Sequence, residues 1–334
     1  MKGRNAILFA LLALLIVLLF VVDMMVGSVS ISARDIVAAI VGTECDPTTR
    51  KIIVDIRLMK AVVAIMAGAA LSVSGLQMQT LFRNPLAGPY VLGVSSGASL
   101  GVALFILGMP LLGAQGLQLF SSIGIAGAAW LGSAAVLAVV GAVSRRIKDV
   151  MVILILGMMI GSGVSAVVQI LQYLSHEEAL KSFVVWTMGS LGDVTSEQLC
   201  LLIVAVVVGL VLAVAVIKPM NMLLLGESYA RTMGLNVKRT RTMILLSTTL
   251  LAGTVTAFCG PVGFIGLAIP HVARAMFCEA DNRVLVPSTA MLGALALLLC
   301  DVVSKMLTLP LNSVTALLGI PIVVWIVVRN KNIV

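Results

Sequence analysis

Ten long apolar runs occupy most of this chain and limit what it can fold into. They lie at about 6–26, 58–81, 90–108, 120–143, 150–171, 197–217, 242–260, 263–278, 285–306 and 313–328. Most of them approach the roughly 20 residues that an α-helix needs to cross the hydrocarbon core of a bilayer. We therefore expect an all-α integral membrane protein of about ten transmembrane helices, organised as a single domain over residues 1–334.

The composition leaves no room for a separate soluble domain. Hydrophobic residues make up 60% of the chain and charged residues only 11%, whereas soluble domains carry about 25% charged residues. This excludes an intrinsic nucleotide-binding module, a metalloenzyme core and a large receptor domain. The first 22 residues resemble a signal peptide, with Lys2 and Arg4 before an uncharged run, but we expect an uncleaved first helix because further spans follow.

The formal charge of +8 is interpreted as a marker of topology rather than of nucleic-acid binding. With ten spans and a cytoplasmic N-terminus, fifteen of the 22 Lys and Arg residues fall on the inside. Cytoplasmic segments of membrane proteins are enriched in these residues. The pattern predicts that both termini are cytoplasmic.

Two breaks rich in glycine and proline suggest a faint inverted repeat. The second span ends at Phe82–Pro89 and the seventh at Gly260–Gly263, and each break leads directly into another apolar run. Five spans separate the two breaks, so the second helix pair would lie upside down relative to the first. Inverted repeats are typical of transport proteins, although two ordinary tight turns would give the same pattern.

Small residues recur at every fourth position in the third and fifth spans, which places each set on one face of a helix. Such faces permit close packing of helices, and one of them could instead line a weakly polar pathway. The third span carries Gly93, Gly97 and Gly101. The fifth span supplies the candidate pathway residues Gly157, Gly161, Ser165 and Gln169.

Ionisable residues are nearly absent from the centres of the spans. Asp23 and Asp301 lie within spans but toward their outer ends, and Asp301 precedes Lys305 by four residues, a spacing that predicts an ion pair on a helix. An ion-coupled secondary transporter usually needs buried carboxylates or broken-helix ion sites. The sequence therefore favours a permease powered by a separate ATPase over that alternative. A membrane assembly subunit without transport activity remains a second alternative.

The longest inside loop, at about 218–241, contains a short predicted helix between Gly226 and Gly234. Glu227 suits the positive N-terminal end of a helix, and Gly234 suits its C-terminal stop. A compact helix of this kind is either a solvated loop element or an element that fits a groove on another protein and transmits motion to the spans.

Three cations face the opposite side, against the general trend of the charges: Arg57, Lys60 and Lys305. They either extend to lipid headgroups or dock an acidic partner. His176 and His271 have no second ligand at helical spacing, so we expect no metal site. No nucleophile, base and orienting acid assemble in the sequence, and we expect neither catalysis nor a cofactor.

Five ordered motifs resemble the FecCD family, the type II permease subunits of ATP-binding-cassette (ABC) importers for iron-siderophores, haem and cobalamin. The resemblance extends from about Arg57 to Arg329. The motifs are Arg57–Lys60, similar to the family's RLPR; Leu81–Ala87 followed by Leu92–Gly97; Pro219–Met222 followed by Gly226–Arg231; Phe264–His271; and Leu317–Pro321.

The resemblance implies a set of partners in the cytoplasmic (inner) membrane of a bacterium. These are a second permease subunit, identical or different, two cytoplasmic ATPase subunits, and a periplasmic or lipid-anchored substrate-binding protein. It also implies a large metal chelate as substrate, an iron-siderophore, haem or cobalamin. The lipid bilayer is the surrounding medium, and no nucleic acid is involved.

The resemblance also assigns roles to residues. Gly226, Glu227, Ala230, Arg231 and Gly234 match the segment that couples the permease to its ATPase. Arg57, Lys60 and Lys305 match arginines of the cobalamin permease that receive glutamates of its binding protein, although lysine lacks the bidentate fork of arginine. The cytoplasmic gate falls at Asn84 and Leu86 and at Val150 and Met151, where the cobalamin permease has small hydroxyl residues in place of the last two.

Overall fold

The computed structural model describes residues 2–27, 31–41, 46–108, 122–144 and 150–329, and these ranges contain helices and no strand. Helical segments coincide with all ten expected spans within these ranges. By length and composition, five of the described helices are long and apolar enough to cross a membrane, beginning at Gly3, Met151, Ser196, Val237 and Asn282. The all-α membrane fold expected from the apolar runs is confirmed.

The longest helices are α1 (Lys2–Met25), α4 (Met59–Phe82), α7 (Ser122–Ser144), α8 (Val150–Leu174), α10 (Ser196–Ala215), α16 (Asn282–Leu307) and α17 (Leu311–Arg329). The remaining elements are α2 (Ala33–Val41), α3 (Pro47–Lys51), η1 (Ile52–Leu58), η2 (Pro89–Leu92), α5 (Val94–Ala103), η3 (Leu104–Gly108), α9 (Glu177–Thr187), α11 (Ile217–Leu224), α12 (Glu227–Thr232), α13 (Val237–Thr248), η4 (Thr249–Gly253), α14 (Thr254–Cys259) and α15 (Ile265–Phe277). Of these, η1, η3 and η4 are π-helical and η2 is a 3-10 helix.

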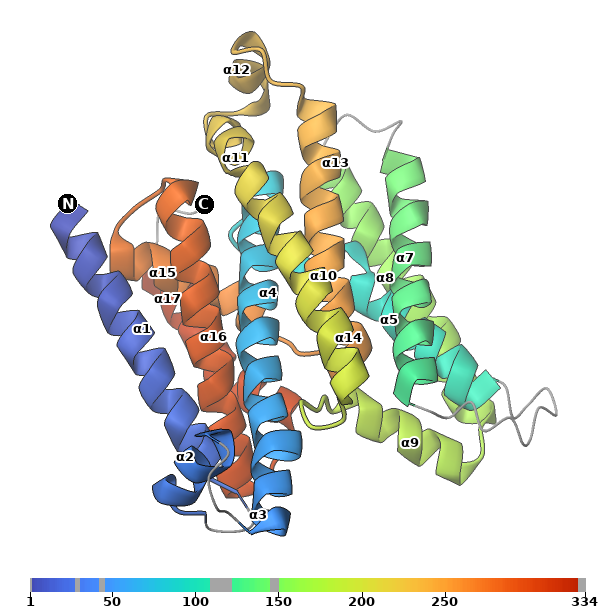
Figure 1. The fold of residues 1–334 in the computed structure, drawn as a ribbon. Coiled ribbons are helices and arrows are strands. Elements are labelled where there is room, and N and C mark those ends of the chain that lie inside the picture. Colours follow the sequence, from blue (N-terminus) through green and yellow to red (C-terminus); the bar gives the residue numbers. More distant parts are fainter. Residues whose placement is uncertain (1, 28–30, 42–45, 109–121, 145–149, 330–334) are drawn as a thin grey trace.

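The long helices lie side by side in a bundle with two distinct ends (Figure 1). α11 and α12 extend from one end, called the α12 end, where α1 begins and α17 ends. α2, α3 and α9 lie at the opposite end, called the α9 end. A chain whose first and last helices have their free ends on the same side matches an even number of crossings.

α4 is the most enclosed of the long helices, and glycine contacts fix its position. It packs against α10, α13, α15 and α16. A Cβ atom at Gly68 would overlap the carbonyl oxygen of Gly293, so the backbones of α4 and α16 meet directly. Ser72 lies at the same contact, with its hydroxyl oxygen 2.6 Å from the Gly68 carbonyl oxygen of its own helix and 2.9 Å from the Thr289 carbonyl oxygen of α16. Small residues at a helix crossing allow this close approach inside a membrane.

The small residues of α5 form a helix-packing face. A Cβ at Gly101 would overlap the Ala128 carbonyl oxygen, and a Cβ at Gly132 of α7 would overlap the Gly97 carbonyl oxygen. α5 and α7 therefore touch through their backbones. For Gly97 and Gly101, the packing interpretation of the repeated small residues is the one that the structure bears out.

The two expected breaks lie at opposite ends of the bundle. α4 ends at Phe82, and the left-handed φ of 48° at the following residue, Arg83, turns the chain into residues 84–88 at the α12 end. The other break follows α14, and the amide of Ser190, just after α9, donates to the Cys259 carbonyl at 2.9 Å. This placement agrees with the upside-down relation that the inverted repeat predicts.

Candidate functional site

A cavity of about 580 Å³ lies between α8 on one side and η2 and α5 on the other. Four of its lining residues are the pathway candidates Gly157, Gly161, Ser165 and Gln169, all on α8. The fourfold spacing of small residues on α8 thus lies along a cavity, whereas at Gly97 and Gly101 of α5 it marks a packing face. A role of the α8 residues in a transport pathway stays a prediction.

The wall of the cavity carries weakly polar and apolar groups. Tyr90, Val91, Gly93, Ser96, Met158 and Ser162 complete the described lining, and none of them is acidic or basic. The hydroxyls of Ser162 and Ser165 donate to carbonyls one turn earlier in α8, at 3.0 and 2.9 Å. Their hydrogen atoms are therefore directed to the helix rather than to a ligand. Sequence analysis missed Ser96 and Ser162, because neither belongs to a fourfold repeat.

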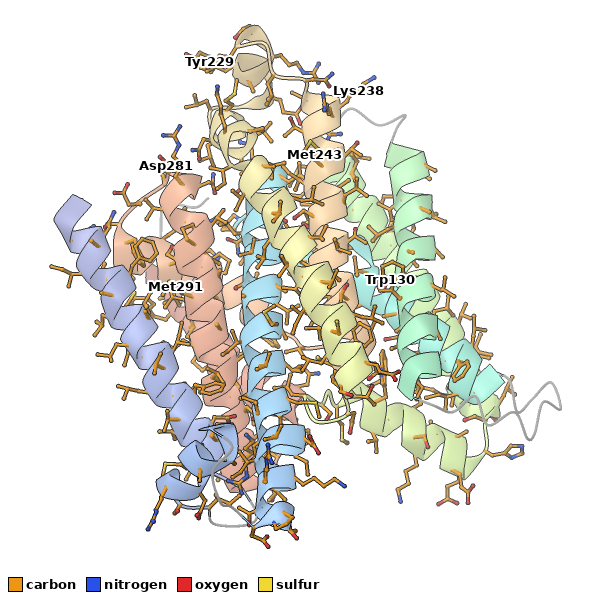
Figure 2. The ribbon with its side chains drawn as sticks, in the orientation of Figure 1. Trp130, Tyr229, Lys238, Met243, Asp281 and Met291 are labelled. Atoms are coloured by element: carbon orange, nitrogen blue, oxygen red, sulfur yellow. The ribbon has the colours of Figure 1, made fainter. Side chains whose placement is uncertain are left out.

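The segment expected to couple the protein to an ATPase forms the projecting helix α12. Gly226 and Gly234 have positive φ angles of 105° and 84° on either side of it, conformations that glycine adopts at little cost. Ala230 is fully buried, while Tyr229 is exposed and stands at the outermost part of the α12 end (Figure 2). The sequence prediction of a short helix between two glycines is confirmed.

Ion pairs fix the orientation of α12. The Glu227 carboxylate lies 2.8 Å from the Arg241 guanidinium of α13 and 3.5 Å from that of Arg231. The Arg241 side chain is 14% exposed and that of Arg231 is 60% exposed. Because exposed ion pairs contribute little, the contact with Arg241 is the stronger restraint.

A hydrogen-bonded cluster ties α11 to the first residues of α16. The side chain of Asn221 donates to the Asp281 carboxylate at 2.6 Å and accepts from the backbone and side chain of Asn282 at 2.9 and 2.7 Å. Asp281 lies at the α12 end (Figure 2). A hydrogen bond from the Arg283 amide, followed by the bond from Asn221, lowers the pKa of Asp281. α12 is thus connected through α11 to α16.

The three cations expected to face outward take part in contacts within the chain. Lys305 lies 2.8 Å from both Asp301 and Asp23, and Lys60 lies 3.0 Å from Asp301. Arg57 is 5% exposed and donates to the Met24 and Met25 carbonyls at 2.7 and 3.0 Å. We refer to these residues, with Asp23 and Asp301, as the ion cluster. It joins α1, η1, α4 and α16.

The ion cluster confirms the predicted pair of Asp301 with Lys305 and adds two partners that sequence analysis missed. Asp23 and Lys305 are separated by 282 residues, so no helical spacing could reveal their contact. The expectation of an outward-facing ring of cations differs from the structure, since the side chains of Lys60 and Lys305 are only 22% and 11% exposed. Their docking role stays a prediction.

The gate candidates lie at the α12 end, in the turn after α4 and at the start of α8. Asn84 shapes the turn, because its side-chain oxygen accepts from the Leu86 amide at 2.9 Å. Leu86 and Met151 are both exposed, and Val150 is the first residue of α8. His271 of α15 contacts the Pro85 carbonyl with its Nε2 atom at 2.7 Å. Among the described residues, no group of three His, Cys, Asp or Glu side chains is placed to hold a metal ion.

Known proteins similar to this chain are transport permeases. The model of the FecCD transport family matches residues 14–329. The hemin transport system permease protein HmuU of Yersinia pestis is 34% identical over 99% of this chain and 98% of its own length. The vitamin B12 import system permease protein BtuC of Salmonella typhi is 37% identical over 82% of this chain and 83% of its own.

A solved structure shows the same fold. It is described as an inward-facing metal-chelate type ABC transporter, with a TM-score of 0.83, 33% identity, and coverage of 97% of this chain and 99% of the other. Neither an ion-coupled secondary transporter nor a non-transporting assembly subunit accounts for these similarities. The chain belongs to the FecCD transport family and is a permease subunit of an ABC importer.

Proposed function

We propose that this permease carries a large metal chelate across the bacterial cytoplasmic membrane by alternating access. The observation that carries the proposal is the cavity along α8, whose described lining has no charged side chain. The similar proteins are named for hemin and vitamin B12, and an iron-siderophore belongs to the same chemical class. A wall of Gly, Ser, Met and Gln holds such a molecule weakly enough to release it.

The cavity supports a pathway shared between two permease subunits. Ser165 and Gln169, which line it, are exposed in the isolated chain. The proposed second subunit, identical or different, covers this side and supplies the facing wall. A pathway along a two-subunit interface accommodates a ligand larger than the 580 Å³ of a single cavity.

The energy for transport comes, in this proposal, from two ATPase subunits that receive α12 on the cytoplasmic side. The exposed Tyr229 and the fixed orientation of Glu227 suit a rigid helix seated in a groove. Gly226 and Gly234 set its ends, Ala230 packs it onto the bundle, and Arg231 faces solvent. Both termini lie on this side, as the excess of inside Lys and Arg predicts.

The remaining assignments concern the two mouths of the pathway. Asn84, Leu86, Val150 and Met151 form the cytoplasmic gate. Substrate arrives from a periplasmic or lipid-anchored binding protein at the α9 end. Lys60 keeps the largest exposure of the three docking candidates, so it is the one best placed to meet an acidic group of that protein. Arg57 and Lys305 support it from within the ion cluster.

Uptake measured after replacement of Gly161 tests the pathway. Gly161 faces the cavity, and Gly163, two residues later on the same helix, has open space around it. In vesicles that contain the permease, its ATPase and its binding protein, Gly161→Phe should reduce ATP-dependent chelate uptake while Gly163→Phe should not. The phenyl ring would occupy cavity space that the chelate needs, so uptake should fall by at least about fivefold, the factor that corresponds to about 1 kcal/mol. Equal uptake by the two variants would contradict the proposal.

A further inference from the structure

α15 holds the turn that contains two of the gate candidates. This turn, residues 83–88, is called the gate turn. We propose that His271 is a positioning residue that fixes the gate turn against α15, so that the turn and α15 move as one body. The inference rests on the gate assignment of the proposed function and extends it to a residue outside the gate.

The contact of His271 is placed at the middle of the gate turn. Its Nε2 atom lies 2.7 Å from the carbonyl oxygen of Pro85, which stands between Asn84 and Leu86. A carbonyl oxygen only accepts hydrogen bonds, so the histidine must donate from Nε2. His271 is 8% exposed, and a donor so enclosed needs the partner that Pro85 provides.

The gate turn is itself a stiff unit, so a single attachment point can fix it. The Leu86 amide donates to the side chain of Asn84 at 2.9 Å, and the Ala87 amide donates to the Asn84 carbonyl at 3.1 Å. Holding Pro85 therefore holds Asn84 and Leu86 in place as well.

A second attachment from the same helix secures the base of the turn. Arg274, one helical turn after His271, donates to the side-chain oxygen of Gln79 at 2.7 Å. The Gln79 side chain donates in turn to the Leu267 carbonyl at 3.1 Å, and the Gln79 backbone carbonyl accepts from the Asn84 amide at 3.2 Å. α15 thus contacts both the last turn of α4 and the loop that follows it.

Direct backbone contacts with α4 hold α15 close enough for His271 and Arg274 to form their hydrogen bonds. A Cβ atom at Gly75 of α4 would overlap the Gly266 carbonyl oxygen, so the two helices touch directly. Pro270 has no N–H to donate to that carbonyl, which leaves Gly266 without its usual helical partner. A Cβ at Gly266 would also lie 2.7 Å from the Pro89 ring, just beyond the far end of the gate turn. α15 therefore contacts residues just before the gate turn, within it and just after it.

The need for an N–H donor at position 271 decides which substitutions to compare. Glutamine at position 271 carries an amide N–H at a reach similar to that of Nε2, asparagine is one methylene shorter, and leucine has no donor. His176, at the α9 end, is exposed and its side chain does not cap α9. His176→Leu is thus a control for loss of a histidine away from the gate turn.

The experiment follows both the gate turn and transport in the assembled importer. A spin label is attached to Leu86→Cys in a background without other cysteines, and its mobility is measured. Chelate transported per ATP hydrolysed is measured separately, in unlabelled protein that keeps Leu86. His271→Leu should increase the mobility of the label and reduce transport per ATP by about fivefold, the factor that corresponds to a hydrogen bond of about 1 kcal/mol. His271→Gln should restore both values, and His176→Leu should change neither.

Each outcome separates the two levels of the proposal. Unchanged mobility in His271→Leu, or failure of His271→Gln to restore it, would overturn the positioning role. Increased mobility with unchanged transport per ATP would support the positioning role but contradict the assignment of Asn84 and Leu86 to the gate. If His271→Leu does not fold, the comparison of His271→Asn with His271→Gln tests the same donor, because asparagine is too short to reach Pro85.

Discussion

Removing the carboxylate of Asp301 should destabilise the protein by leaving Lys60 without its acidic partner. Asp301 is 1% exposed and lies 3.0 Å from Lys60 and 2.8 Å from Lys305. Breaking a fully buried ion pair by removing one partner costs about 3–5 kcal/mol. Lys305 keeps its contact with Asp23 at 2.8 Å, and Lys60 is partly exposed. For Asp301→Asn we therefore expect a smaller loss, of about 2 kcal/mol.

The free energy of unfolding, measured by titration with a denaturing detergent in mixed micelles, provides the assay. In the double variant Asp301→Asn with Lys60→Met, most of the loss should be recovered, because removing both partners of a buried pair is often nearly neutral. Glu197→Gln, at an exposed position on α10, should change the free energy of unfolding by less than about 0.5 kcal/mol. Purely additive losses in the double variant would refute the argument from charge pairing.

Three further predictions concern other elements. Gly293→Val should destabilise the protein by about 1–3 kcal/mol in the same unfolding assay, because its Cβ would overlap a carbonyl of α4, whereas Gly127→Val, in open space, should not. Glu227→Gln should lower ATP-dependent uptake in vesicles, because the contact of Glu227 with Arg241 orients α12 at the surface. The free energy of unfolding should change by less than about 1 kcal/mol. Unchanged uptake would count against coupling through α12. Because the pKa of Asp281 is lowered in the folded state, its carboxylate stabilises the fold at pH values above the ordinary aspartate pKa of about 3.9. This contribution is lost as the pH falls through the folded-state pKa. In Asp281→Asn this acid-range change in the free energy of unfolding should be absent.

The positions of the spans could be predicted from the sequence because the membrane itself imposes them. A helix in lipid must satisfy its own backbone and present apolar side chains, so each span appears as an apolar run. The helix at Glu227–Thr232 was also predictable, since Gly226 and Gly234 mark its two ends locally. The fourfold spacing on α8 selects four residues of the cavity wall, but the same spacing is also compatible with a packing face.

The contacts that join distant spans could not be predicted in this way. His271 and Pro85 are 186 residues apart, and Asp23 and Lys305 are 282 apart. Sequence periodicity describes one helix at a time and does not show which faces of two helices meet. The same limit explains why the spacing of small residues did not distinguish the packing face at Gly101 from the cavity wall at Gly161.

The direct backbone contacts of α4 with α15 and α16 limit how this protein can change shape. Where glycine meets a carbonyl with no side chain between them, two helices cannot slide along each other without first separating, because the next residue along is larger. α4, α15 and α16 should therefore move together as one rigid unit. We expect α8, which lines the open cavity beside η2 and α5, to move more than this unit, so that alternating access would tilt α8 against α4, α15 and α16.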